Sequence, residues 1–217
     1  MAQTSSPTPR STYRHGDLRR ALLEAGVELA RDGGPDAVVL REATRRAGVV
    51  PNAAYRHFAN REELLRAVRH AALSALAVAM ETELANVQRR GRRPADVARA
   101  GLRALGLGYL GFARAEPGLF RMFRMFSAPE FNDGVDPAAA GAGGLSPIQL
   151  LNAALDKLVE AGVLSAARRP GAEYLAWSAV HGLAMLITDG PLSQLAPAEL
   201  DDVSQRLVEM MEKGLSL

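Results

Sequence analysis

Hydrophobic side chains recur every three or four positions along most of the chain, which is the spacing of amphipathic helices. The first such segment runs from about Asp17 to Asp32 and ends at the stop signal Gly33-Gly34-Pro35. The pattern offers almost no strand signal, because the β-branched run Val38-Val39 is too short to count. We therefore predict an all-α fold of about nine helices, with a three-helix N-terminal unit followed by a larger helical domain. The other predicted helical segments are Leu40–Ala47, Pro51–Phe58, Asn60–Arg89, Ala95–Ala113, Pro147–Ala161, Gly171–Asp189 and Pro197–Lys213, and the segment from Leu119 to Phe126 is short and strongly apolar.

The longest predicted helix begins at Asn60, which has the capping-box spacing to Glu63. If this helix reaches Arg89, it is about 45 Å long at about 1.5 Å per residue and joins two domains without a flexible linker. Ser127–Ser146 is rich in Gly, Ala, Pro and Asp and is typical of a loop. We expect no chemistry from its low-complexity part, Ala138–Gly144.

Composition narrows the classes of protein. The chain has 217 residues, 48% of them hydrophobic, and it has no cysteine, which excludes disulfides and zinc–thiolate sites. The longest apolar run is far shorter than a membrane span, and the first twelve residues lack the apolar core of a signal peptide. We therefore expect a cytoplasmic protein with no membrane partner.

Charge is distributed unevenly along the chain. Residues 10–69 carry 12 arginines against 8 acidic residues, whereas the remainder has 14 basic against 16 acidic residues. A basic front half indicates a polyanionic partner for that half, although the excess is small.

Leu40–Ala47 and Pro51–Phe58 are joined by Gly48-Val49-Val50, and two short helices with such a turn form a helix-turn-helix. In that motif the second helix lies in the DNA major groove and the first crosses the backbone. The second helix is predicted to present Asn52, Ala53 and Arg56 outward, with Tyr55 and His57 near phosphates and Phe58 packed inward. An ordinary helical hairpin has the same spacing, so spacing alone leaves both interpretations open.

The stretch from His15 to Leu65 resembles the TetR/AcrR family of bacterial repressors. Arg46–Val49, Tyr55–Phe58 and Arg61–Leu65 carry the resemblance. It implies a recognition element at Pro51–Phe58, with phosphate contacts from Tyr55, His57 and Arg61. The complete predicted set of DNA-contacting residues is Arg41, Pro51, Asn52, Ala53, Tyr55, Arg56, His57 and Arg61.

Two positions depart from the family pattern. Val39 and Val50 stand where the family often has Ser or Thr, whose hydroxyls cap a helix and donate to phosphate. Valine can do neither, and the loss of a helix cap costs about 0.5–2 kcal/mol. We therefore expect neither side chain to contact phosphate through a hydrogen bond.

The second half resembles a TetR-like C-terminal domain group with a W-x-x-x-H-G stretch. Trp177–Gly182 and Glu116–Arg121 carry this resemblance, which implies dimerisation and effector binding. Burial within one chain remains the alternative for the apolar faces of the last two helices. The residues predicted to form the dimer interface are Leu175, Leu183, Leu186, Leu200, Val203, Leu207 and Met210.

Aromatic and methionine side chains of the second half are candidates for a pocket that takes a small apolar effector. Plain core is the alternative for the same residues. Trp177 and Met185 occupy the positions four residues from His181 where a second metal ligand would stand, so we expect no metal. We find no catalytic acid–base pair or nucleophile either, and expect no cofactor. The candidate pocket residues are Tyr109, Phe112, Phe120, Phe123, Trp177, His181 and Met185.

These expectations describe a homodimeric repressor that binds a double-stranded, near-palindromic DNA operator. Its parts are a disordered arm at residues 1–12, a helix-turn-helix DNA-binding domain at 13–60, and a ligand-binding and dimerisation domain at 61–217. A helical enzyme, a protein-interaction module and an activator are the alternatives.

Overall fold

The computed structural model describes residues 15–88, 90, 92–125 and 136–216, and within these ranges it has nine α-helices and no β-strand. This confirms the predicted all-α class. The α-helices are α1 (His15–Ala37), α2 (Leu40–Arg46), α3 (Pro51–Ala54), α4 (Arg61–Ala85), α5 (Pro94–Ala115), α6 (Pro117–Phe120), α8 (Pro147–Glu160), α9 (Ala172–Thr188) and α10 (Pro197–Ser216). Short 3₁₀ turns are η1 (Arg121–Met125), η2 (Pro137–Ala139), η3 (Ala166–Arg168) and η4 (Pro191–Gln194).

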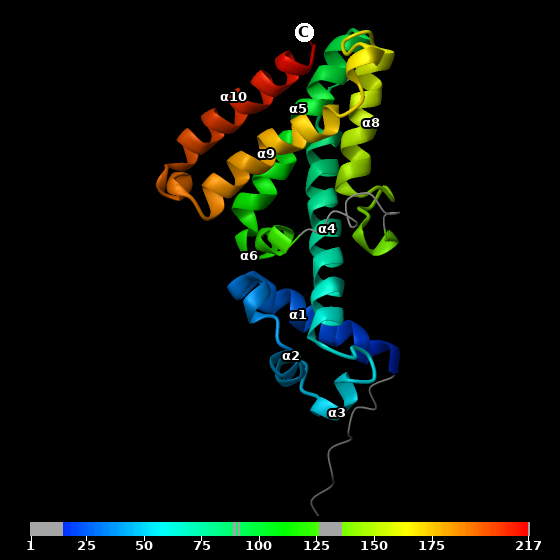
Figure 1. Cartoon of the computed structure of the whole chain (residues 1–217), viewed down its shortest axis with the longest axis vertical. Coiled ribbons are helices and arrows are strands. Elements are labelled where there is room, and N and C mark those ends of the chain that lie inside the picture. Colours follow the sequence, from blue (N-terminus) through cyan, green and yellow to red (C-terminus); the bar gives the residue numbers. More distant parts are fainter. Residues whose placement is uncertain (1–14, 89, 91, 126–135, 217) are drawn as a thin grey trace, which may run out of the picture.

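The helices form two parts along the long axis of the molecule. Figure 1 shows α1, α2 and α3 at one end, which we call the head. Helices α5 to α10 form the other part, which we call the body, and α4 runs from the head into the body. The predicted end of the first helix is confirmed, because Gly33 and Gly34 have non-helical dihedral angles inside the range of α1.

Helix α4 begins as predicted, because the Asn60 side chain accepts a hydrogen bond from the Glu63 amide at 2.9 Å. The Glu63 carboxylate reaches the Ala59 amide at 2.7 Å. The prediction that α4 reaches Arg89 is wrong, because the helix ends at Ala85. Its 25 residues span about 37 Å.

Head and body meet where α6 lies against the end of α1. An ideal Cβ placed on Gly118 would lie 2.3 Å from the Ala30 carbonyl oxygen and 2.2 Å from that of Arg31, so only glycine fits there. Beside this contact, the Arg31 guanidinium donates to the Glu116 carboxylate at 3.1 Å. The packing therefore joins the two parts through main-chain atoms.

Residues 136–146, which we call the glycine loop, lie along α4. The Glu81 carboxylate accepts hydrogen bonds from the amides of Ala142 and Gly143, each at 3.0 Å. The Ser74 hydroxyl donates to the Ala140 carbonyl at 2.6 Å. Main-chain groups of Ala138–Gly144 therefore hold the loop on α4. The rest of the predicted Ser127–Ser146 loop, up to residue 135, lies outside the described residues.

Candidate nucleic-acid interface

The head contains the predicted pair of short helices. Gly48 has a φ of +67° in the turn between α2 and α3, a conformation that favours glycine. The Val49 amide then donates back to the Thr44 carbonyl at 3.0 Å, and the Val49 side chain packs against the hydrophobic core. The turn thus fixes how α3 projects from α2.

The recognition helix is shorter than predicted. Helix α3 ends at Ala54 and does not reach Phe58. The Ala54 carbonyl accepts hydrogen bonds from the amides of both His57 and Phe58, each at 2.9 Å, so the chain turns there. This turn buries Phe58 completely, which confirms its predicted inward packing.

Helices α2 and α3, which lie at the end of the head away from the body (Figure 1), and the turn after α3 contain all the predicted DNA-contacting residues except Arg61, the first residue of α4. Asn52, Tyr55 and Arg56 are exposed, Ala53 and His57 are partly exposed, and the Pro51 side chain is not described. Residues 43–61 contain no Asp or Glu, so no acidic side chain of this stretch opposes a polyanion.

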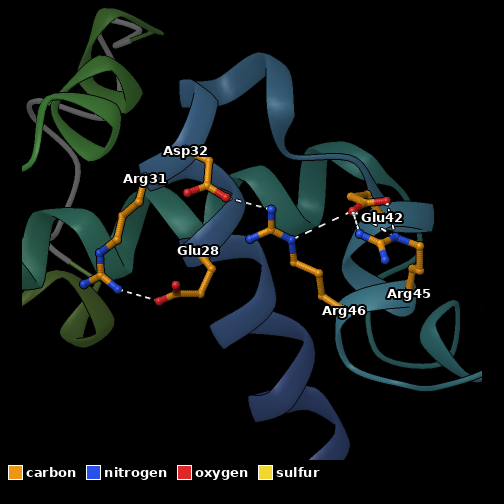
Figure 2. Close-up of polar contacts among 6 residues, drawn as sticks. All are labelled: Glu28, Arg31, Asp32, Glu42, Arg45 and Arg46. Atoms are coloured by element: carbon orange, nitrogen blue, oxygen red, sulfur yellow. Dashed lines mark hydrogen bonds and ion pairs between the residues drawn. The ribbon is translucent and has the colours of Figure 1, made fainter.

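Two arginines of α2 are held by acidic partners. Figure 2 shows Arg45 and Arg46 on either side of Glu42, with Arg46 also reaching Asp32 of α1 at 2.7 Å. The hydrogen bond from Arg45, whose Nε lies 2.9 Å from Glu42 Oε2, holds the pKa of the Glu42 carboxyl below its usual range. Arg46 therefore links α2 to α1, whereas the Arg45 ion pair lies within α2.

Arg61, which is one of the predicted DNA-contacting residues, has hydrogen-bond partners inside the head. Its Nε donates to the Val38 carbonyl at 2.8 Å and its Nη2 to the Pro35 carbonyl at 2.7 Å. The phosphate contact of Arg61 stays a prediction. Among the described residues, the side chains of Arg41 and Arg56 are exposed and make neither a hydrogen bond nor an ion pair.

Val39 and Val50 are the residues that precede α2 and α3. Neither side chain makes a capping hydrogen bond. Val39 is 42% exposed and Val50 69% exposed, so both valines face solvent at the same end of the molecule as the exposed Tyr55.

Two family models match the sequence. The model described as bacterial regulatory proteins of the tetR family matches residues 22–68. The model described as the tetracyclin repressor-like C-terminal domain matches residues 102–211, about half of the chain. The chain belongs to the TetR family of transcriptional regulators. The helix-turn-helix of this regulator is therefore a DNA-binding element.

Solved structures agree with the TetR assignment. A protein of unknown function from Rhodococcus sp. RHA1 is 25% identical with a TM-score of 0.72, over 96% of this chain and 100% of that one. A TetR family regulator from Marinobacter aquaeolei VT8 is 20% identical with a TM-score of 0.62, over 93% and 96%. FadR from Bacillus subtilis, solved in complex with stearoyl-CoA, is 14% identical with a TM-score of 0.65, over 90% and 98%. No curated protein matches the sequence.

The candidate pocket residues of this TetR regulator gather in the body around α5. The ring centroids of Phe120 and Phe123 are 5.5 Å apart, and those of Tyr109 and Phe120 are 5.8 Å apart. The rings of Phe112 and Phe123 stack at 6.1 Å. All four aromatic side chains are buried, and they pack on one another.

A polar pair lies at the edge of this aromatic cluster. The Tyr109 hydroxyl is 2.8 Å from His181 Nδ1, and Trp177 lies beside His181 with ring centroids 5.3 Å apart. Burial raises the pKa of the Tyr109 phenol above its usual range, and a hydrogen bond from Trp177 opposes that shift. Burial also lowers the pKa of His181, so this pair is neutral near pH 7. Met185 is partly buried against the same core.

The predicted dimer-interface residues divide into three groups. Leu175, Leu186 and Met210 are exposed, at 65%, 44% and 62%. Val203 and Leu207 are partly buried. Leu183 and Leu200 are covered by other residues of the same chain, at 6% and 8% exposure, so for these two the alternative of burial within one chain is favoured. Tyr174, which is not among the predicted residues, is 46% exposed and lies beside Leu175 on α9.

In the ranges that the structure describes, no three His, Asp or Glu side chains gather as a metal site requires. No helix of those ranges is long and apolar enough to cross a membrane.

Proposed function

We propose that this TetR regulator is a repressor that binds a palindromic operator as a homodimer and responds to a small apolar effector. The observation that carries the proposal is the tip of the head, where Arg41 and Arg56 are exposed and have no acidic partner in the part of the chain that the structure describes. Asn52 and Tyr55 are exposed beside them. Cations and polar groups in this arrangement suit a duplex with phosphates on its rim and base edges in its groove.

The residues of the tip take different roles in this proposal. Arg56 and Asn52 have side chains that pair with the edges of guanine and adenine, respectively. Tyr55, His57 and Arg41 contact phosphates, which fixes the position of the head on the duplex without reading sequence. A base-reading residue affects sequence preference, whereas a phosphate-contacting residue affects binding to all duplexes.

The dimer rests on the outer face of α9 and α10. Leu175, Leu186 and Met210 expose apolar side chains there, and large exposed apolar groups in a cluster mark interaction sites. A twofold axis through this face presents two heads to one duplex. Half-sites are then about 34–36 Å apart, or a multiple of that spacing.

The effector site that we propose lies at the aromatic cluster of the body. Its apolar rings suit an apolar molecule, and the Tyr109–His181 pair offers one polar anchor. If such an effector weakens operator binding, linkage requires that the operator weaken effector binding by the same factor.

The test of operator binding begins with selection of duplexes from a random-sequence pool by the full-length chain, followed by footprinting. Arg56→Ala is expected to lower operator affinity about 10-fold or more while leaving binding to random DNA less affected. Tyr55→Ala is expected to lower both affinities by similar factors. Arg45→Ala is the matched control, because Arg45 is an exposed arginine of the same head that is held by Glu42.

The outcomes separate the candidates. Equal losses on operator and random DNA for Arg56→Ala contradict its base-reading role. A wild-type chain that shows no salt-dependent DNA binding contradicts operator binding and favours a protein-interaction module. The dimer is tested by sedimentation of Leu175→Glu together with Met210→Glu, which is expected to sediment as a monomer with unchanged helix content. A wild-type monomer contradicts the proposed dimer.

A further inference from the structure

The most exposed large hydrophobic side chain among the described residues belongs to Val50, at the tip of the head. Val50 is 69% exposed, and it lies in the turn that leads directly into α3. Water-exposed valine is unfavourable, and neither the core nor the described elements of the body cover it. The same end of the head carries Tyr55 at 59% exposure.

The position of Val50 restricts which part of a duplex it meets. In a helix-turn-helix, the residues at the N-terminal end of the second helix contact base edges in the major groove. Val50 has no hydrogen-bond donor in its side chain, so it cannot bind phosphate or a base nitrogen or oxygen through that side chain. The apolar group that base edges present in the major groove is the 5-methyl group of thymine.

We propose that Val50 contacts the 5-methyl group of one thymine in each half-site and is therefore a specificity-determining residue. The inference rests on the proposed operator binding and adds a base preference to it. The Ser or Thr that the family often has at this position donates a hydrogen bond to phosphate, which carries no sequence information. Valine replaces that hydrogen bond with an apolar contact that distinguishes thymine from cytosine.

The backbone around Val50 holds the side chain ready for this contact. The Val50 carbonyl accepts a hydrogen bond from the Ala53 amide at 3.0 Å, which fixes the residue at the start of α3. A β-branched side chain has few χ1 rotamers, so little conformational freedom is lost when it meets the methyl group. Val39 differs in place, because it precedes α2, the helix that crosses the DNA backbone in this motif.

The test uses the duplex selected by the wild-type chain. Each thymine is replaced, at the symmetry-related positions of both half-sites, by deoxyuridine, which lacks only the 5-methyl group. For one thymine pair, the replacement is expected to weaken wild-type binding about fourfold for each half-site, the equivalent of about 0.8 kcal/mol for one buried CH₂ group. Val50→Ala is expected to bind the thymine and deoxyuridine duplexes equally, and Val50→Ile to keep the wild-type discrimination.

Two variants control for exposed valines elsewhere. Val39→Ala, in the same head, and Val78→Ala, which is 43% exposed on α4, are expected to keep the wild-type discrimination between the two duplexes. Because the side chains of all three valines are exposed, the alanine variants are expected to keep the wild-type Tm, measured by circular dichroism.

Three results overturn the inference. The first is a selected operator in which no thymine replacement weakens wild-type binding, and the second is discrimination that persists in Val50→Ala. The third is loss of discrimination in Val39→Ala or Val78→Ala as well. A wild-type chain that selects no sequence contradicts the proposed function itself, and the inference with it, so the two failures are distinguishable.

Discussion

The head and the body are both helical, but they place their polar side chains differently. In the head, Arg45 and Arg46 meet their acidic partners at the surface (Figure 2), and Arg41, Asn52, Tyr55 and Arg56 are exposed. In the body, the Glu212 carboxylate is only 2% exposed and is held by Arg99, Arg103 and the Ser216 hydroxyl. Ion pairs between arginines and carboxylates therefore lie at the surface of the head, whereas in the body one of them includes a buried carboxylate.

This difference separates the residues of the head that are candidates for DNA binding from the residues of the body that stabilise the fold. Exposed ion pairs contribute little to stability, because water and salt screen them. A buried carboxylate that loses its partner is costly, because its charge is then uncompensated in a low-dielectric environment. Substitutions in the head are thus expected to change DNA binding more than stability, and substitutions in the body the reverse.

The largest expected effect lies where the two parts meet. In Gly118→Ala, the added methyl group collides with the carbonyl oxygens of Ala30 and Arg31, which are main-chain atoms that cannot rotate away. We expect a loss of about 3 kcal/mol in the free energy of unfolding, measured by urea denaturation. Gly111→Ala is the control, because its added methyl group meets nothing within 4 Å and the helix of α5 gains about 0.5–1 kcal/mol. Equal stabilities of the two variants contradict the close contact.

The next effect compares one arginine from each part. Arg99→Ala leaves the buried Glu212 with Arg103 as its cationic partner and with the Ser216 hydroxyl, and it is expected to lower the free energy of unfolding by about 2 kcal/mol. Arg45→Ala removes a solvent-exposed partner of Glu42, and we expect the free energy of unfolding to stay nearly unchanged. The measurement is urea denaturation of both variants in the same buffer. An equal loss in both variants removes the distinction between head and body.

The smallest expected effect is a pH dependence of the body. Burial lowers the pKa of His181, so the unfolded chain takes up a proton at this residue at a higher pH than the folded chain does. The contribution of His181 to the free energy of unfolding is therefore fully present above the ordinary histidine pKa. It declines as the pH falls from that value toward the lower pKa that His181 has in the folded chain. We expect unfolding at pH 7.5 and 5.5 to show this decline in the wild type and a smaller one in His181→Gln. An equal decline in the wild type and in His181→Gln contradicts the conclusion that His181 causes the pH dependence.

Much of the helical framework follows from local patterns in the sequence. The end of the first helix at Gly33, the cap at Asn60 and the inward packing of Phe58 are set by nearby residues, and the structure confirms each of them. The length of α3 was not predictable in this way. Apolar spacing from Pro51 to Phe58 fits one helix, and it equally fits a short helix with a turn that buries the same phenylalanine.

The sites depend on contacts between distant residues, which a single sequence does not reveal. Periodicity identifies the apolar faces of α9 and α10, but it does not distinguish Leu183 and Leu200, covered by this chain, from Leu175 and Met210, which are not. In the same way, a net charge shows that the head is basic. It does not separate Arg45, which has an acidic partner, from Arg56, which has none among the described residues.

The glycine loop has a consequence for how the molecule behaves as ionic strength changes. It meets the charge of Glu81 with main-chain amides and so needs no lysine or arginine at this joint. Binding of a protein to nucleic acid weakens steeply as the salt concentration rises, because counterions compete for the phosphates. Short hydrogen bonds from neutral amides are far less sensitive to salt. A rise in salt concentration that weakens binding of the regulator to DNA is therefore expected to leave the hydrogen bonds between Glu81 of α4 and the glycine loop, which leads into α8, intact.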